Sequence, residues 1–174
     1  MIKSYPEAFT AQFAGVVTCH PLRHPGVVAR QQALPWHYGR EFDGAGGERF
    51  VESYDTLANS SPLEGKTRLI SIVCSAKKGR EGHRIRDGFV SYLERMRIPG
   101  LDIFGTGRER VAACKRDAIA PYRYHIAIEN SRCPHYWTEK LADCYLGGAL
   151  PFYWGCPELE RYFPAGSFAL IDIE

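Results

Sequence analysis

Residues 124–154 read YHIAIENSRCPHYWTEKLADCYLGGALPFYW, and this stretch decides the fold class. It opens with a β-prone apolar run, Tyr124–Ile128, and closes with another, Leu150–Trp154. Between them, Thr138–Leu146 carries apolar residues at helical spacing, and Gly147 stands where a helix commonly ends. A strand, a helix and a strand in this order predict two parallel strands joined by a crossover helix.

The same alternation extends outward from that unit in both directions. Continuous apolar runs predict further strands, and a helical period predicts one more helix. The strands are expected at Gly15–Thr18, Leu69–Ser75, Leu101–Phe104 and Phe168–Ile171, the helix at Ile85–Met96, and extended backbone at Leu34-Pro35. We therefore predict an α/β fold, a Rossmann-like parallel sheet with flanking helices. In such sheets ligands bind beyond the carboxyl ends of the strands.

Length and composition exclude several classes of protein. The chain has 174 residues, enough for one α/β domain, or for one domain and a fragment of another. Its net charge of +2 is too small to predict binding to nucleic acid. The sequence has no apolar run long enough to span a bilayer, and Met1–Gly15 lacks the pattern of a signal peptide. We expect a cytoplasmic protein, at most peripheral to a membrane.

The cysteines and histidines give no strong sign of a metal or redox site. The six cysteines form no CxxC pair, so we interpret them as reduced, packed thiols, with a disulfide framework as the weaker alternative. The spacing of Cys133, His135 and His125 matches no common zinc site. Gly105-Thr106-Gly107 lacks the third glycine of a dinucleotide fingerprint, which argues against NAD. We interpret His37, which follows a tryptophan, as a packing residue.

Arg86 and Lys140 are placed where a helix disfavours positive charge. Each follows a predicted strand and a loop, and each falls in the first turn of a predicted helix. A cation at a helix N-terminus costs roughly 0.3–1 kcal/mol when exposed, because that end carries a partial positive charge. Two such placements at one edge of a sheet indicate a shared anion, and a diphosphate fits. The alternative is that both residues are solvated surface charges.

Polar residues gather between the strand that ends at Ile128 and the next helix. Glu139 is suited to accept hydrogen bonds from two ribose hydroxyls, and Asn130 offers both a donor and an acceptor. Tyr136 can pack and donate, and Glu129 is a further candidate for the same site. Thr138 suits an N-cap. The simpler alternatives are a plain cap for Thr138, a half-buried core residue for Tyr136 and a solvated charge for Glu129.

The segment Arg123–Asp172 resembles the signature of glycosyltransferase family 10, the α-1,3/4-fucosyltransferases. That signature has a strand ending in F-E-N, then Y-V-T-E-K, a helix, G-A-(I/V)-P, an apolar strand and P-x-S-F-I. This chain reads I-E-N, Y-W-T-E-K, G-A-L-P and A-G-S-F-A-L-I-D in the same order. Upstream, I-R-D-G-F at 85–89 resembles the family's I-R-N-x-F, and L-D-I-F-G-T-G at 101–107 resembles its D-x-(F/Y)-G turn. Residues 24–39 resemble the passage from the acceptor domain into the donor domain.

The resemblance implies a GT-B fold, in which two Rossmann-like domains enclose the active site, and this chain would supply the C-terminal half. It implies transfer of fucose from GDP-fucose, with inversion, to a hydroxyl of a β-galactoside or N-acetylglucosamine-containing glycan, without an essential metal. By motif position, Arg86 and Lys140 would hold the diphosphate and Glu139 the ribose. Asn130 and Tyr136 would also lie in the donor site.

The chain is short for the family, and this shapes the expected domains and partners. Residues 1–40 are expected to be a remnant of the acceptor domain, 41–65 a linker rich in Gly, Asp, Glu and Ser, and 66–174 the GDP-sugar-binding domain. The family's general base belongs to the acceptor domain, so we assign it to no residue. Three alternatives remain: a catalytically inactive nucleotide-sugar-binding module, a transferase for another GDP-sugar, and a half that pairs with a second copy or with an acceptor-domain chain.

Overall fold

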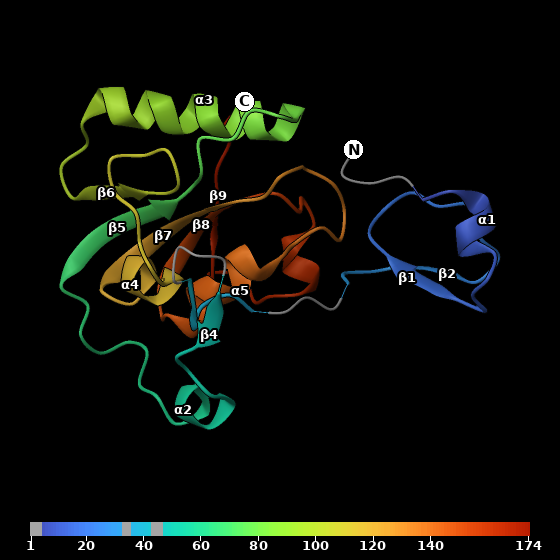
Figure 1. Ribbon diagram of the computed structural model, residues 1–174, viewed down its shortest axis with the longest axis horizontal. Coiled ribbons are helices and arrows are strands. Elements are labelled where there is room, and N and C mark those ends of the chain that lie inside the picture. The colour runs from blue at the N-terminus through green and yellow to red at the C-terminus, as the bar shows by residue number, and fades with distance from the viewer. Residues whose placement is uncertain (1–4, 33–35, 43–46) are drawn as a thin grey trace.

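A five-stranded parallel sheet forms the centre of the protein, with strand order β6-β5-β7-β8-β9 (Figure 1). The computed structural model describes residues 5–32, 36–42 and 47–174. The strands are β5 (Arg68–Val73), β6 (Leu101–Phe104), β7 (Tyr122–Ile128), β8 (Leu150–Trp154) and β9 (Ala169–Leu170). Every neighbouring pair in this sheet is parallel. The predicted α/β class and the predicted strands of this sheet are confirmed.

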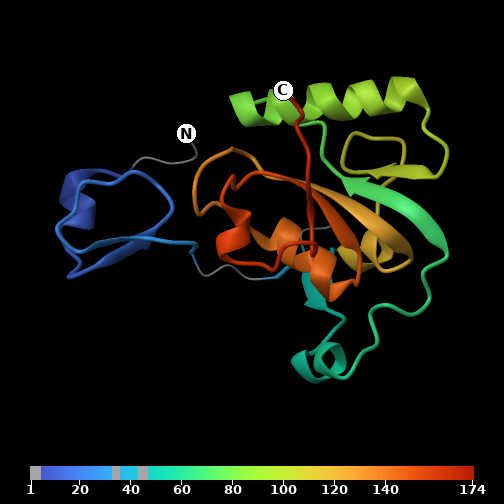
Figure 2. The same cartoon turned by 180° about the vertical axis from the view of Figure 1, so that it is seen from behind.

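Helices cover both faces of the sheet (Figures 1 and 2). The long helix α3 (Glu81–Met96) lies along one face, and α4 (Lys115–Ile119) and α5 (Glu139–Leu146) lie on the other. The chain therefore leaves β5 toward one face and leaves the neighbouring strand β7 toward the other. Such a switch point opens a crevice beyond the carboxyl ends of the two strands, and ligands of doubly wound sheets bind there.

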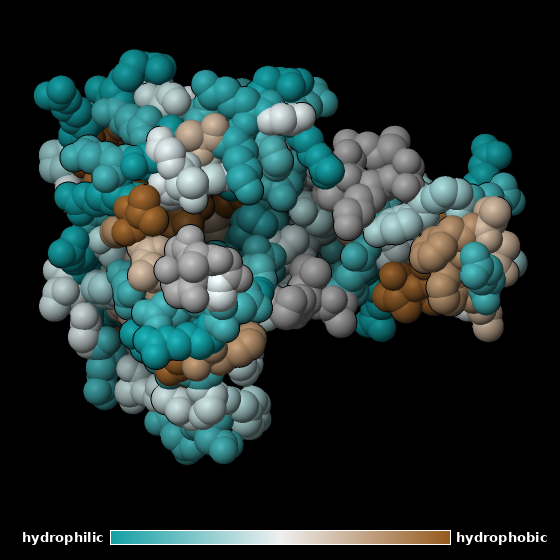
Figure 3. Space-filling model, viewed as in Figure 1, coloured by the Kyte–Doolittle hydropathy of each residue, from teal (hydrophilic) through white to brown (hydrophobic). Residues whose placement is uncertain are grey.

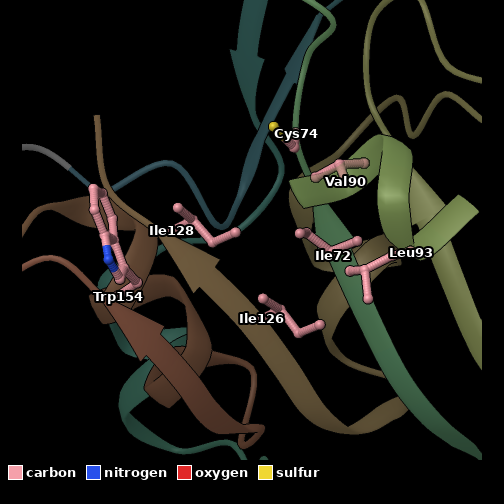
Figure 4. Packing of buried hydrophobic residues seen from close by; sticks show 7 residues of the cluster. All are labelled: Ile72, Cys74, Val90, Leu93, Ile126, Ile128 and Trp154. Atoms are coloured by element: carbon pink, nitrogen blue, oxygen red, sulfur yellow. The ribbon is translucent and has the colours of Figure 1, made fainter. Parts of the chain in front are cut away.

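The strand alternation of β7 explains how the two faces are filled. Ile126 and Ile128 pack toward α3, against Val90 and a cluster that Figure 4 shows in full. Ala127, between them, faces the opposite side and packs beneath Leu141 of α5. Side chains of a strand point alternately to its two faces, so a strand buried on both sides reads as a continuous apolar run. This is why the sequence predicted β7 correctly.

Two of the helices that flank the main sheet differ from the prediction. Helix α3 begins at Glu81, four residues before the predicted start at Ile85. The prediction was wrong because the first turn is polar and contains Gly82, so the apolar period becomes visible only later. Arg86 consequently lies in the second turn of α3, not the first as predicted. Helix α4 was not predicted at all, since it has only five residues.

The N-terminal segment lies to one side of the sheet (Figures 1 and 2). It contains α1 (Glu7–Thr10) and a parallel pair of short strands, β1 (Val16–Thr18) and β2 (Val27–Ala29). The predicted strand at Gly15–Thr18 is confirmed, whereas Leu34-Pro35 falls outside the described residues. Apolar side chains gather on this segment in the space-filling view (Figure 3). Its exposed apolar residues include Phe9, Phe13, Val17 and Val28.

Part of the stretch expected to be a linker has regular structure. Strands β3 (Arg40–Phe42) and β4 (Glu48–Phe50) form an antiparallel pair, followed by α2 (Tyr54–Ala58). Glu52 accepts a 2.7 Å hydrogen bond from Arg116 of α4, which fixes this stretch against the main sheet. The division into domains at residues 40 and 65 stays a prediction.

Candidate functional site

A cavity of about 280 Å³ lies beyond the carboxyl end of β5, at the switch point of the sheet. Val73 and Ser75 at the end of β5 and Phe104 at the end of β6 form part of its wall. Charged side chains from three helices form much of the remainder: Arg86 of α3, Lys115 of α4, and Glu139 and Lys140 of α5. The structure therefore brings together Arg86, Glu139 and Lys140, which the sequence predicted to share one ligand.

Arg86 is buried, with 8% of its surface exposed. Its Nη1 donates to Asn130 Oδ1, and its Nη2 donates to Cys74 Sγ at 3.4 Å. Its Nε is buried and has no hydrogen-bond partner, and no carboxylate of the described residues forms an ion pair with the guanidinium. Burying an uncompensated cation is costly, so the arrangement favours an anionic ligand beside it.

Lys140 lies in the first turn of α5, as predicted. Thr138 is the N-cap, and its Oγ1 accepts a hydrogen bond from the Lys140 backbone N–H at 3.3 Å. The Lys140 Nζ lies 3.3 Å from Glu129 Oε2 and 3.3 Å from Glu139 Oε1. Unlike Arg86, Lys140 therefore has two carboxylate partners, and these hold its ammonium near the N-terminus of α5.

Glu129 is completely buried, so the alternative of a solvated charge is wrong. Its carboxylate accepts hydrogen bonds from the Thr138 backbone N–H at 2.7 Å and from Thr138 Oγ1 at 2.7 and 2.9 Å. Burial raises the pKa of Glu129 above its ordinary value, although Lys140 and Thr138 act in the opposite direction. Through these contacts Glu129 links the end of β7 to the start of α5 and fixes the positions of Thr138 and Lys140.

Three neighbours make their shortest contacts with Glu139 at the same carboxylate oxygen. The nitrogens of Lys115, Lys140 and His37 lie 3.7, 3.3 and 3.6 Å from Glu139 Oε1. Burial alone would raise the pKa of Glu139, but Lys140, Lys115 and His37 outweigh it and lower the pKa to about 2. Glu139 is therefore an ionised hydrogen-bond acceptor at neutral pH.

Asn130 and Tyr136 line a second, adjacent cavity of about 270 Å³. Glu139 and Lys140 border both cavities, so the two spaces meet at the start of α5. Burial, followed by Glu129 and Glu139, raises the pKa of Tyr136, so its hydroxyl remains a neutral donor. The far wall of this cavity comes from the N-terminal segment, including Tyr5 and His20. Tyr136 is thus separated from the cavity that Arg86 borders.

Sequence reasoning missed three residues of the first cavity. Lys115 and Arg40 border it, and His37, interpreted as a packing residue, also lies in its wall. No periodic signal marks Lys115, because α4 is a single short turn. Arg40 is the last residue of the stretch that was expected to be a remnant of the acceptor domain. The signal that existed was the basic pair Lys115-Arg116, which precedes the strand β7 in the sequence.

The described residues contain no group of three or more His, Cys, Asp or Glu side chains arranged to hold a metal ion. The combination of Cys133, His135 and His125 is no exception. His125 is buried within β7 and shares a 2.8 Å hydrogen bond with Ser71, and burial, followed by Lys115, lowers its pKa to about 3. His135 Nδ1 instead contacts the Tyr162 hydroxyl at 2.7 Å.

All six cysteines are free thiols, and no helix within the described ranges could cross a membrane.

Comparison with known proteins identifies a family over most of the chain. Residues 63–173 match the family described as glycosyltransferase family 10 (fucosyltransferase) C-term. Human alpha-(1,3)-fucosyltransferase 7 is 32% identical over 120 residues, which are 65% of this chain and 33% of that protein. The alpha-(1,3)-fucosyltransferase FucT of Helicobacter pylori is 33% identical over 54 residues, 31% of this chain and 11% of that protein. The chain thus spans about a third of the human relative and less of the bacterial one.

Solved structures support the same grouping. An alpha1,3-fucosyltransferase in complex with GDP superposes with a TM-score of 0.51 at 25% sequence identity, covering 67% of this chain and 33% of that one. An alpha1,3-fucosyltransferase with GDP-fucose superposes with a TM-score of 0.50 at the same identity and coverage. The sheet described above therefore has the fold of the C-terminal half of GT-B fucosyltransferases.

Proposed function

Because the chain belongs to glycosyltransferase family 10, we propose that residues 66–174 bind GDP-fucose and that the chain serves fucosyl transfer. In the proposed reaction a hydroxyl of a β-galactoside or N-acetylglucosamine-containing glycan attacks the anomeric carbon of fucose, GDP leaves, and the configuration inverts. The chain spans a third of the length of the human relative, so the activity of the whole protein is part of this proposal.

The observation that carries the proposal is the state of Arg86. A guanidinium that is 8% exposed, with a buried Nε that has no partner, stands in the wall of a cavity at the switch point. A phosphate group satisfies such a cation better than water does, because guanidinium and phosphate form paired, charge-assisted hydrogen bonds. We assign the diphosphate to the space between Arg86 and Lys140, which border the same cavity.

The other predicted residues take their roles from their positions around that diphosphate. Glu139 would accept hydrogen bonds from the ribose hydroxyls, and Asn130 and Tyr136 would face the sugar in the adjacent cavity. Thr138 and Glu129 would act through Lys140, which they position. As fucose departs, negative charge grows on the diphosphate, and the fixed cations stabilise that charge more in the transition state than in the ground state. We propose that no divalent metal is essential.

A carboxylate that deprotonates the acceptor hydroxyl is required by this chemistry. Family resemblance places it in the acceptor domain, and neither Glu7 nor Glu41 matches a family motif. We therefore assign no general base.

Release of GDP from GDP-fucose tests the proposal directly. We expect GDP release that depends on a β-galactoside acceptor and that persists in EDTA, because side chains supply the charge compensation. Tight binding of GDP-fucose without acceptor-dependent release would instead support a nucleotide-sugar-binding module. Faster release from GDP-mannose than from GDP-fucose would reassign the donor, and loss of GDP binding in EDTA would contradict the metal-independent mechanism.

The acidity of Glu139 gives a prediction on pH. Its pKa of about 2 lies below the ordinary value of 4.5, so in the folded protein the carboxylate stays ionised throughout the range from about pH 5 to pH 8. The preference for GDP over 2′-deoxy-GDP, which we expect to be about tenfold, should therefore stay constant across this range. Titration calorimetry at several pH values measures it, and a preference that disappears as the pH falls toward 5 would argue against Glu139 as the ribose acceptor.

A further inference from the structure

Helix α4 brings Lys115 into the donor cavity and fixes it there. The helix is short, but its neighbours hold it tightly: Ala118 and Ile119 are buried, and the Arg116 backbone N–H donates to the Tyr38 carbonyl at 3.0 Å. Cys114, directly before the helix, is buried and donates its thiol to the same carbonyl at 3.1 Å. The first residue of α4 therefore has a well-defined position, and its side chain borders the same cavity as Arg86, Glu139 and Lys140.

The ammonium of Lys115 lies between two carboxylates of α5. Its Nζ is 2.8 Å from Asp143 Oδ2 and 3.7 Å from Glu139 Oε1. Glu139 and Asp143 are four residues apart on one face of the helix, where two negative charges repel each other. Lys115 neutralises this repulsion, and without it the Glu139 side chain would be pushed away from its present position.

Asp143 anchors Lys115, and its burial keeps it away from a ligand. Its side chain is 1% exposed, Oδ2 accepts from Lys115, and Oδ1 accepts the His37 backbone N–H at 3.0 Å. Asp143 does not line the cavity, whereas Glu139 does. The two carboxylates held by Lys115 therefore have different roles: one fixes the lysine, and the other faces the ligand.

The contacts of Glu139 show what Lys115 achieves. Lys115, Lys140 and His37 all make their shortest contacts with Oε1, so these three side chains together fix the carboxylate at that oxygen. Lys115 also differs from Arg86, since two carboxylates already compensate its charge and a phosphate is not needed to do so. This arrangement orients an acceptor for hydroxyl groups rather than a cation for phosphate.

We propose that Lys115, anchored by Asp143, is a positioning residue that orients the Glu139 carboxylate toward the ribose hydroxyls and so makes the site selective for ribonucleoside diphosphates. This inference rests on the proposed function, because it takes GDP as the ligand of the cavity. It assigns to Lys115 a part in selectivity for the sugar of the nucleotide and no contact with the diphosphate.

Substitution of Lys115 tests the inference against a matched control. Arg116→Met removes an equal charge from the next position of α4, where the side chain pairs with Glu52 away from the cavity. Titration calorimetry with GDP and 2′-deoxy-GDP is applied to wild type, Lys115→Met, Lys115→Arg and Arg116→Met. We expect Lys115→Met to weaken GDP binding about tenfold and 2′-deoxy-GDP binding about twofold, which reduces the preference for GDP from about tenfold to about twofold. Lys115→Arg should restore it, and Arg116→Met should leave both affinities within about twofold of wild type.

The outcomes separate this inference from the proposed function. If wild type binds neither nucleotide, the proposed function is wrong. If wild type prefers GDP and Lys115→Met keeps that preference, or lowers the affinity for both nucleotides equally, only the positioning role is overturned. Circular dichroism checks folding, and Lys115→Gln, which can still donate to Asp143, replaces Lys115→Met if the latter does not fold.

Discussion

Arg86→Ala is expected to lower the affinity for GDP by about 100-fold, the loss of a buried, charge-assisted pair of hydrogen bonds to a phosphate. The guanidinium is held by Asn130 Oδ1 and Cys74 Sγ and is therefore already oriented before the ligand arrives. Little conformational freedom is lost on binding, so most of the interaction energy appears as affinity. Removing this buried cation should change stability little in the absence of nucleotide, because relief of the cost of burying an uncompensated charge offsets the loss of the hydrogen bonds to Asn130 and Cys74. Titration calorimetry and urea unfolding measure the two quantities.

Arg84→Ala is the matched control for this prediction. Arg84 is an arginine of the same helix, two residues earlier, and it is exposed and borders neither of the two cavities. We expect its removal to change GDP affinity by less than about twofold, since exposed charges are screened. Lys140→Ala should weaken GDP by about tenfold, because its ammonium is already compensated by Glu129 and Glu139. Equal losses of GDP affinity from Arg84→Ala and Arg86→Ala would mean that GDP binding depends only on the net charge of α3 and not on the position of Arg86.

Gly82→Ala is expected to destabilise the protein by about 1–3 kcal/mol, although alanine is the better helix former. A Cβ at Gly82 would lie 1.8 Å from the Asn130 carbonyl oxygen, which belongs to the backbone after β7. The first turn of α3 and the end of β7 would have to separate. Asn130 accepts the hydrogen bond of Arg86, so this separation should also weaken GDP binding.

Gly88→Ala, in the same helix, should have the opposite effect and raise the free energy of unfolding. Gly88 is exposed, and a Cβ there meets no atom within 4 Å. We expect a gain of about 0.5–1 kcal/mol, because alanine has less backbone freedom to lose on folding. Urea unfolding of the two variants measures both values, and a stabilising Gly82→Ala would disprove the close contact between α3 and the end of β7.

The central sheet could be predicted from the sequence because its strands are buried on both faces. Leu69–Ser75 and Tyr124–Ile128 are continuous apolar runs, and such runs are hard to mistake when predicted helices separate them. The start of α5 was also predictable, since Thr138 has the residue type and the position of an N-cap. The predicted end of β7 and the predicted start of α5 together place Lys140 and Glu139 in the site without any knowledge of the tertiary structure.

The remainder of the site depends on contacts between distant residues. Lys115 becomes part of it only because it meets Asp143 and Glu139 across the fold, and no spacing in the sequence encodes that meeting. Glu129 was a candidate for the site, but a solvated surface charge stayed open as the alternative, because a carboxylate is rarely buried unless it is paired. Its partners, Thr138 and Lys140, stand nine and eleven residues away. The start of α3 was missed because its first turn packs through a glycine, which leaves no apolar signal.

A crystal structure with GDP bound tests the central claim most directly. We expect diphosphate oxygens within hydrogen-bonding distance of both the Arg86 guanidinium and the Lys140 ammonium, and ribose hydroxyls at the Glu139 carboxylate. The larger cavity of about 560 Å³ beside the first turn of α3, bordered by Arg80 and Arg132, offers the diphosphate a different place. Density for GDP in that cavity, with Arg86 left without an anion, would contradict the account.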